Sequence, residues 1–188
     1  MRIVDLCAHS ICVSGPLAYF ITFSTYGSHL HGSEPGSVDR DHNAVGNPYA
    51  VPDSNRLTLT KKRTRGAPYS LGSAGRAAVL RAIQQVCKHR GWIFAAHVRT
   101  SHVHVVVDAA IAPERVMRDF KAYASRSLNH TKAWIRHGST RYLWECDDVI
   151  HAERYVVEGQ GDPMSVFVDT APLLSRLGNN PMQSEPRE

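Results

Sequence analysis

Hydrophobic and polar residues alternate most clearly from His102 to Asp108, in the run His-Val-His-Val-Val-Val-Asp. A β-strand sends successive side chains to opposite faces, so this alternation predicts a strand. Valines at every second position from Val103 would bury one face, while His102 and His104 would stand together on the other. Two imidazoles so placed can meet one divalent ion, or one phosphate, from the same side. A half-buried histidine beside a solvated one is the more ordinary explanation for an isolated pair of this kind.

The rest of the pattern predicts strands and helices on either side of this strand. Runs rich in aromatic and β-branched residues indicate strands, and apolar residues spaced every three or four positions indicate helices. Ser73 is a plausible N-cap for one helix and Gly91 its stop, while Pro113 fits the first turn of the next. Strands are expected at 17–25, 92–100, 102–108 and within 142–150, and helices at 73–90, 113–130 and 148–159.

This order of elements favours an α+β fold, with helices packed on one face of a mainly antiparallel sheet, and the ferredoxin-like topology is the nearest named arrangement. The length of 188 residues predicts one domain, which we place at 1–178. Its long connection at about 26–71 is dense in Gly, Pro, Asn, Asp, His and Ser, and is either functional or poorly ordered. Residues 179–188 are expected to form a disordered tail.

The composition is that of a globular protein, with 43% hydrophobic and 21% charged residues and a formal net charge of +5. Such a charge is consistent with a polyanionic partner, but many soluble proteins carry as much. None of the four cysteines forms a Cys-x-x-Cys pair, and Cys87 falls on the apolar side of a predicted helix, so buried free thiols in a reducing compartment are expected. No signal peptide or membrane-spanning run is apparent, which makes the cytoplasm the expected location.

Two histidines do not make a structural zinc site, which needs four ligands, and no Cys/His cluster with suitable spacing accompanies them. A two-histidine site with open positions, completed by an oxygen ligand and a substrate phosphate, fits better. Tyrosine can serve as a covalent nucleophile beside such an ion. Tyr123 lies close to an apolar helix stripe and Tyr155 lies on the polar side of the last predicted helix, and the pattern alone does not choose between them.

Several segments together resemble the single-tyrosine HUH transposases, and most of all the REP-associated tyrosine transposases. Each is weak alone, but they occur in the order typical of that family and extend from about residue 18 to residue 164. The segments are Phe20-Ile21-Thr22-Phe23-Ser24-Thr25-Tyr26-Gly27, His102-Val103-His104, Phe120-Lys121-Ala122-Tyr123-Ala124-Ser125-Arg126, Tyr142-Leu143-Trp144 and Arg154-Tyr155-Val156-Val157-Glu158-Gly159-Gln160.

The resemblance implies an enzyme that binds hairpin-forming single-stranded DNA, usually as a homodimer, and transfers strands through a 5′-phosphotyrosine intermediate. It implies a divalent metal, Mg or Mn, held by His102, His104 and a polar third ligand, with Tyr155 as the nucleophile. That third ligand commonly follows the tyrosine by one helical turn, where this chain has a glycine. We therefore expect Gln160, one residue later, as the third ligand, with Glu158 as the alternative.

Basic side chains are the expected contacts to the DNA backbone, because Lys and Arg neutralise phosphates without reading sequence. The candidates, for each of which a solvated surface is the competing explanation, are Lys121, Arg126, Lys61, Lys62, Arg63 and Arg65. A nucleoid-associated protein in the cytoplasm is expected on this basis.

Three other functions stay open. A rolling-circle initiator or relaxase shares the His-x-His strand, but those proteins are usually larger or joined to a helicase. A domesticated relative would bind palindromic repeats without cleaving them. A metal-binding or phosphodiesterase domain unrelated to transposition would form no covalent adduct with DNA.

Overall fold

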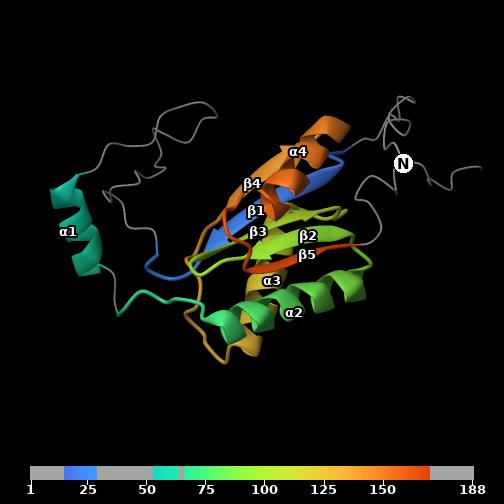
Figure 1. Cartoon of the computed structure of the whole chain (residues 1–188). Coiled ribbons are helices and arrows are strands. Elements are labelled where there is room, and N and C mark those ends of the chain that lie inside the picture. Colours follow the sequence, from blue (N-terminus) through green and yellow to red (C-terminus); the bar gives the residue numbers. More distant parts are fainter. Residues whose placement is uncertain (1–14, 29–52, 64–65, 170–188) are drawn as a thin grey trace, which may run out of the picture.

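The computed structural model describes residues 15–28, 53–63 and 66–169 (Figure 1). The expected tail at 179–188 and the domain end at 178 lie outside these residues. The elements, in chain order, are β1 (Ala18–Ser24), α1 (Ser54–Arg63), α2 (Ser73–Arg90), β2 (Phe94–Val98), β3 (His102–Val107), α3 (Pro113–Ser127), β4 (Ser139–Leu143), α4 (Cys146–Val157) and β5 (Ser165–Val168).

The strands form one antiparallel sheet in the order β4-β1-β3-β2-β5. Helix α2 connects β1 to β2 and helix α3 connects β3 to β4, and in each case one strand lies between the two that are connected. This is the split βαβ arrangement of ferredoxin-like folds, extended by β5 at one edge. The predicted α+β class with an antiparallel sheet is confirmed.

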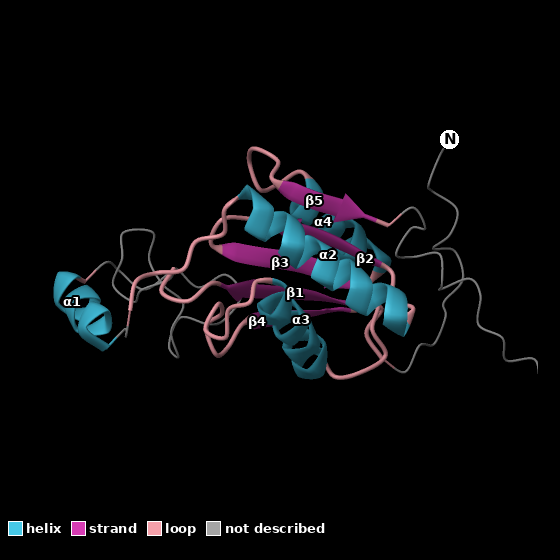
Figure 2. Cartoon of the chain, turned by 90° about the horizontal axis from the view of Figure 1, so that it is seen from below, coloured by secondary structure: helices cyan, strands magenta, loops and turns pink. Residues whose placement is uncertain are grey.

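Helices cover both faces of the sheet. Figures 1 and 2 show α2 and α3 on one face and α4 on the other. The expectation of helices on a single face therefore holds for α2 and α3 and is wrong for α4. The physical reason is that the second face is also apolar in part, because Ala18, Val106 and Leu143 gather there and pack against the α4 side chains Val149 and Val156.

The main core lies between the sheet and the helices α2 and α3. Strand alternation supplies one side of it, with Ile21 and Phe23 from β1 and valines from β3. Helix periodicity supplies the other side, with Ile83 of α2 and Phe120 of α3 completely buried. At roughly 25 cal/mol per Å² of apolar surface removed from water, this layer is the main source of the stability that holds β3 in place.

Local signals marked the helix ends closely. Gly91 caps α2 in the left-handed conformation, with φ of 68°, which a glycine adopts without the steric cost that a Cβ would bring. Pro113 begins α3, as expected. The N-cap of α2 is Gly72 instead of Ser73, and no side chain caps it. The fourth strand, expected within 142–150, spans Ser139–Leu143, so it begins three residues before that range and only its last two residues lie inside it.

The long connection contains a helix that we did not expect. Helix α1 begins after Asp53, whose carboxylate accepts hydrogen bonds from the backbone N–H groups of Asn55 and Arg56 at 2.9 and 3.1 Å. An Asp at this position satisfies N–H groups that lack an intrahelical partner, and it is the one local signal in the sequence from which the helix start could have been predicted. The helix has no clear apolar stripe, which is why periodicity did not reveal it.

Cys87 is a completely buried free thiol in α2, as predicted, and its burial raises the pKa of the thiol well above the usual range. Over residues 15–28, 53–63 and 66–169, none of the helices combines the length and the apolar character needed to cross a bilayer.

Candidate active site

His102 and His104 lie side by side on the face of β3 that α4 covers. Their ring centroids are 4.8 Å apart and their planes meet at 72°. The intervening Val103 points to the opposite face and is part of the main core. The predicted alternation is confirmed, and it presents two imidazoles to one small region of space.

The His104 ring is held on two sides by β1, the neighbouring strand. The Thr22 hydroxyl, on the residue directly across the strand pair, lies 2.7 Å from His104 Nδ1. Phe20 stacks on the same ring, with 5.6 Å between centroids and 24° between planes. The Thr22 hydroxyl occupies Nδ1, so Nε2 is the ring nitrogen left to other groups. Contacts of this kind orient a metal-binding histidine.

Burial keeps the His104 imidazole neutral. Only 8% of the residue is exposed. Burial first, and then the charge of neighbouring His102, lower the pKa of His104 to about 3, while hydrogen bonding to the Gln160 side chain acts in the opposite direction. A neutral imidazole is the form that donates a lone pair to a metal ion, so this environment suits a ligand.

Tyr155 lies on α4 beside the histidines of its own chain. Its ring meets the His104 ring edge-on at 5.8 Å between centroids, and it meets the Phe20 ring at 5.9 Å. Nearly half of the residue, 47%, is exposed. Residues that are 51 positions apart in the sequence are thus brought together, and the tyrosine is open to an incoming ligand.

The two candidates for the third ligand point in different directions. Glu158 forms an exposed ion pair with Arg154 at 3.2 Å, on the outer side of α4. The Gln160 side chain instead reaches His104, and its amide Nε2 donates to the Tyr155 carbonyl at 3.4 Å. The arrangement favours Gln160 over Glu158, although its role as a metal ligand stays a prediction.

The end of α4 explains how Gln160 turns inward. The helix stops at Val157, and the N–H of Gly159 closes the last turn on the Tyr155 carbonyl at 3.0 Å. A Cβ at Gly159 would lie 2.9 Å from that carbonyl oxygen, so the turn is this tight because the residue is glycine. The glycine thus occupies the place expected for the ligand and lets the next residue reach the histidines.

The predicted ligands, His102, His104 and Gln160, would offer two imidazole nitrogens and an amide oxygen. Among the described residues, no group of three or more His, Cys, Asp or Glu side chains is placed to hold a metal ion. A set without thiolate or carboxylate does not fit a structural zinc site. It does fit a divalent ion such as Mn that keeps open positions for water or a phosphate oxygen.

His97 is a residue of this region that the sequence analysis missed. It lies on β2, directly across from His104 in the strand register, and it is completely buried. Its Nδ1 lies 3.0 Å from the Val156 carbonyl oxygen, and its Nε2 lies 3.2 Å from the Met164 backbone nitrogen. The only available signal was a histidine inside an otherwise apolar strand, which does not reveal its partners.

Tyr123, the competing tyrosine, lies away from the histidines. It belongs to α3, on the opposite face of the sheet, and packs against the main core. The guanidinium carbon of Arg126 lies 4.3 Å from the centre of its ring. The fold therefore brings Tyr155, and not Tyr123, to the histidine pair.

Comparisons with known proteins add one finding. No protein-family model matches the sequence, and no curated protein matches it. Among solved structures, the chain is similar to the REP-associated tyrosine transposase bound to a REP hairpin. The sequences are 12% identical, the match covers 80% of this chain and 70% of that one, and the TM-score is 0.45. A likeness of this size does not carry an activity from one chain to the other.

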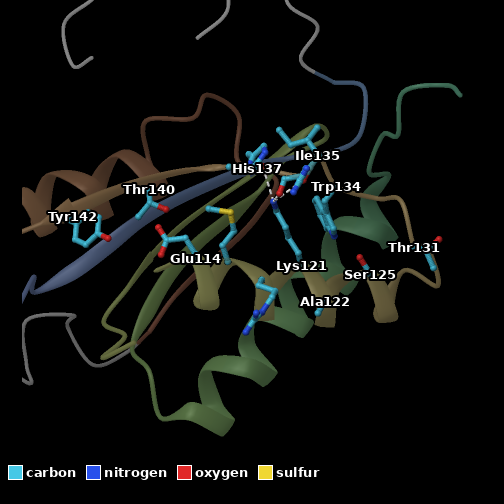
Figure 3. Close-up of a pocket in the computed structure, with 14 residues that line it drawn as sticks. Glu114, Lys121, Ala122, Ser125, Thr131, Trp134, Ile135, His137, Thr140 and Tyr142 are labelled. Atoms are coloured by element: carbon cyan, nitrogen blue, oxygen red, sulfur yellow. Dashed lines mark hydrogen bonds between the residues drawn. The ribbon is translucent and has the colours of Figure 1, made fainter. Parts of the chain in front are cut away.

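Lys121 lies at a pocket on the α3 side of the sheet, of about 670 Å³. Figure 3 shows its side chain reaching the segment after Trp134. The ammonium donates to the carbonyls of Ile135, Arg136 and His137 at 3.1, 3.4 and 3.0 Å. Burial lowers the pKa of Lys121 to about 8. An ammonium has three hydrogens, and these carbonyls engage them, so in this structure Lys121 holds a loop in place.

The other basic candidates are placed only in part. Arg126 is exposed on α3 and rests on Tyr123. Lys61, Lys62 and Arg63 lie in α1, but their side chains are outside the described residues, as is all of Arg65. Contact of these residues with DNA stays a prediction.

Proposed function

We propose that this protein is a metal-dependent transposase-type enzyme that cleaves single-stranded DNA at or near hairpins and rejoins it through a 5′-phosphotyrosine intermediate. One observation carries the proposal. A half-exposed tyrosine on α4 lies against His104, one of two histidines side by side on β3, within one chain. In the proposal, Tyr155 is the nucleophile, and the two histidines are ligands for an ion that would hold the phosphate.

In the proposed reaction, the phenolic oxygen of Tyr155 attacks the phosphorus of a DNA phosphodiester. A bond from this oxygen to phosphorus forms, and the bond from phosphorus to the 3′ oxygen breaks. The phenol loses its proton to water, to which the side chain is open, and the departing 3′ oxygen gains one to become a hydroxyl. The link to the 5′ phosphate retains the free energy of the broken phosphodiester, and a 3′ hydroxyl can later reverse the step without ATP.

His102, His104 and the Gln160 amide oxygen would hold the divalent ion, Mg or Mn. When bound, the ion supplies positive charge that stabilises the charge developing on the phosphate oxygens, and it positions the phosphate. The Thr22 hydroxyl keeps the His104 ring in the orientation that this requires.

The position of Tyr155 supports attack within its own subunit, because its ring is beside His104 of the same chain. A homodimer is part of the proposal on the strength of the sequence resemblance, and light scattering after size exclusion tests it. We place the contacts to the DNA backbone on basic side chains, with Arg126 as the exposed candidate on α3.

A covalent-adduct assay tests the proposal. The protein is incubated with labelled single-stranded DNA hairpins that carry flanking single strands, in Mn²⁺ or Mg²⁺, and the products are separated in denaturant. We expect a labelled protein band that needs the metal and is lost in Tyr155→Phe. Tyr123→Phe is the matched control, and we expect it to form the adduct as the native protein does.

Each other outcome has a defined meaning. An adduct that survives in Tyr155→Phe and disappears in Tyr123→Phe would show that the nucleophile is wrongly assigned. Tight binding of hairpins with no adduct on any of them would indicate a DNA-binding module that has lost cleavage. Neither binding nor an adduct would leave a metal-binding or phosphodiesterase domain as the better explanation.

A further inference from the structure

His97 occupies a position next to the candidate active site without being part of its donor set. It is the cross-strand neighbour of His104, and residues paired in this way point to the same face of the sheet. Its side chain lies under the end of α4 and has no exposed surface. A buried polar ring on an otherwise apolar strand needs partners for its nitrogens.

Backbone groups on both sides satisfy the ring and determine its tautomer. A carbonyl oxygen can only accept, so Nδ1 carries the hydrogen and donates to Val156 at 3.0 Å. A backbone N–H can only donate, so Nε2 accepts from Met164 at 3.2 Å. The ring is therefore neutral, and burial lowers the pKa of His97, which keeps it so.

These two bonds hold the connection between α4 and β5 against the sheet. Val156 is in the last turn of α4, and Met164 directly precedes β5, so one ring ties the two ends of the connection between the helix and the strand. Gln160 is in the middle of this connection. Its side chain contacts His104 and the Tyr155 carbonyl.

Other anchors of the same connection lie at its surface. Arg99 donates to the Asp162 carbonyl at 3.1 Å, and the Thr100 hydroxyl contacts the Met164 sulfur at 3.6 Å. Both contacts are exposed to water, where such bonds contribute little because water replaces them readily. His97 is the buried anchor, and in the described residues it alone bonds both ends.

We propose that His97 is a positioning residue, which sets the height of the 158–164 connection above the sheet and so places Gln160 and Tyr155 against the His102–His104 pair. The inference rests on the proposed function for what the site does. It also makes a structural claim that does not depend on activity: two neighbouring histidines hold the connection in place. His97 bonds the backbone at both of its ends, and His104 contacts the Gln160 side chain in its middle.

The test compares His97→Leu with His97→Gln. Leucine fills much of the buried space but removes both bonds, whereas the glutamine amide carries one donor and one acceptor and can restore both. Val105→Ala is the control, because Val105 is a completely buried residue on the opposite face of the neighbouring strand β3, and its truncation lowers stability without touching the connection. Urea unfolding curves establish that each variant is folded under the conditions of the assays.

Two kinds of measurement are made on the full chain. The first needs no activity: hydrogen exchange of the amides from Val156 to Met164, and the NMR signals of the His104 ring and the Gln160 amide. The second is the rate of adduct formation at saturating hairpin and Mn²⁺, together with the dissociation constants for Mn²⁺ and for the hairpin.

For His97→Leu we expect faster exchange across the connection, shifted His104 and Gln160 signals, and Mn²⁺ binding weakened about 10-fold or more. We expect a fall in adduct rate of about 10-fold or more, with hairpin affinity within about threefold of the native value, since the backbone contacts that dominate DNA affinity are elsewhere. His97→Gln should recover most of the loss. Val105→Ala should lower stability and leave the His104 and Gln160 signals unchanged.

Unchanged exchange and unchanged His104 and Gln160 signals in His97→Leu would overturn the inference. So would equal losses in His97→Leu and Val105→Ala, because a general loss of stability would then explain both. If the native protein forms no adduct, the proposed function fails, while the exchange and NMR measurements still decide whether His97 positions the connection.

Discussion

The ring of Tyr155 lies edge-on to the ring of His104, with 5.8 Å between their centroids and 73° between their planes. Phe20 contacts both rings, so an aromatic side chain of β1 fixes the separation between helix and strand. The nucleophile candidate and the ligand candidates consequently share one rigid frame. Small changes in that frame are expected to affect chemistry more than stability, which makes the site testable by single substitutions.

Gln160→Ala is expected to weaken Mn²⁺ binding about 10-fold and to slow adduct formation at saturating DNA, because it removes the amide oxygen of the proposed donor set. Glu158→Ala is the control, since its carboxylate is paired with Arg154 on the outside of α4. Mn²⁺ affinity is measured by calorimetry. A larger effect in Glu158→Ala than in Gln160→Ala would make Glu158 the ligand.

Thr22→Val is expected to lower Mn²⁺ affinity by about 10- to 100-fold, the usual effect of removing a partner that orients a metal-binding histidine. The hydroxyl that lies 2.7 Å from His104 Nδ1 is replaced by a methyl group of similar size. Thr140→Val, a similar change on the pocket side of the sheet, serves as control and should bind Mn²⁺ as the native protein does. Equal affinities for the native protein and Thr22→Val would remove Thr22 from the site.

Lys121→Met is expected to lower the free energy of unfolding by about 1–3 kcal/mol, because loop carbonyls lose their donor. Arg126→Met should cost less than about 1 kcal/mol, as an exposed cation–π contact does. Urea unfolding measures both. The salt dependence of hairpin binding tests the other predicted role of Lys121, contact with the DNA backbone. If Lys121 contacts a phosphate, its loss reduces the slope of log K against log[salt] by about 1.

Acid should destabilise the metal-free protein through His104. Its pKa is about 3 when folded and 6.5 when unfolded, so below pH 6.5 the unfolded chain binds a proton that the folded chain does not. The free energy of unfolding therefore falls by about 1.4 kcal/mol per pH unit from this group as pH drops from 6.5 toward 3. The contribution of neutral His104 to the free energy of unfolding is fully present only above pH 6.5.

The matching variant is His104→Gln, which lacks the titrating group. Between pH 7.5 and 5.0 in EDTA, the native protein should lose about 2 kcal/mol more stability than this variant. Urea unfolding at the two pH values measures the difference. Equal losses in the two proteins would mean that His104 titrates normally in the folded state.

The sequence by itself determined the features that depend on local spacing. Alternation along 102–107 placed two histidines on one face, because a strand repeats every two residues whatever surrounds it. Gly91 ended one helix and Pro113 began another, because their backbone preferences act within a few residues. The antiparallel α+β fold followed from the order of such elements.

Only the tertiary structure decided which distant groups meet. It set α4 on the face opposite α2 and α3, turned Gln160 inward and Glu158 outward, and engaged Lys121 with loop carbonyls. It also placed His97 beneath the end of α4, which no sequence spacing indicated. The reason is that periodicity specifies which side of its own element a residue occupies, whereas long-range packing specifies what lies across from that side.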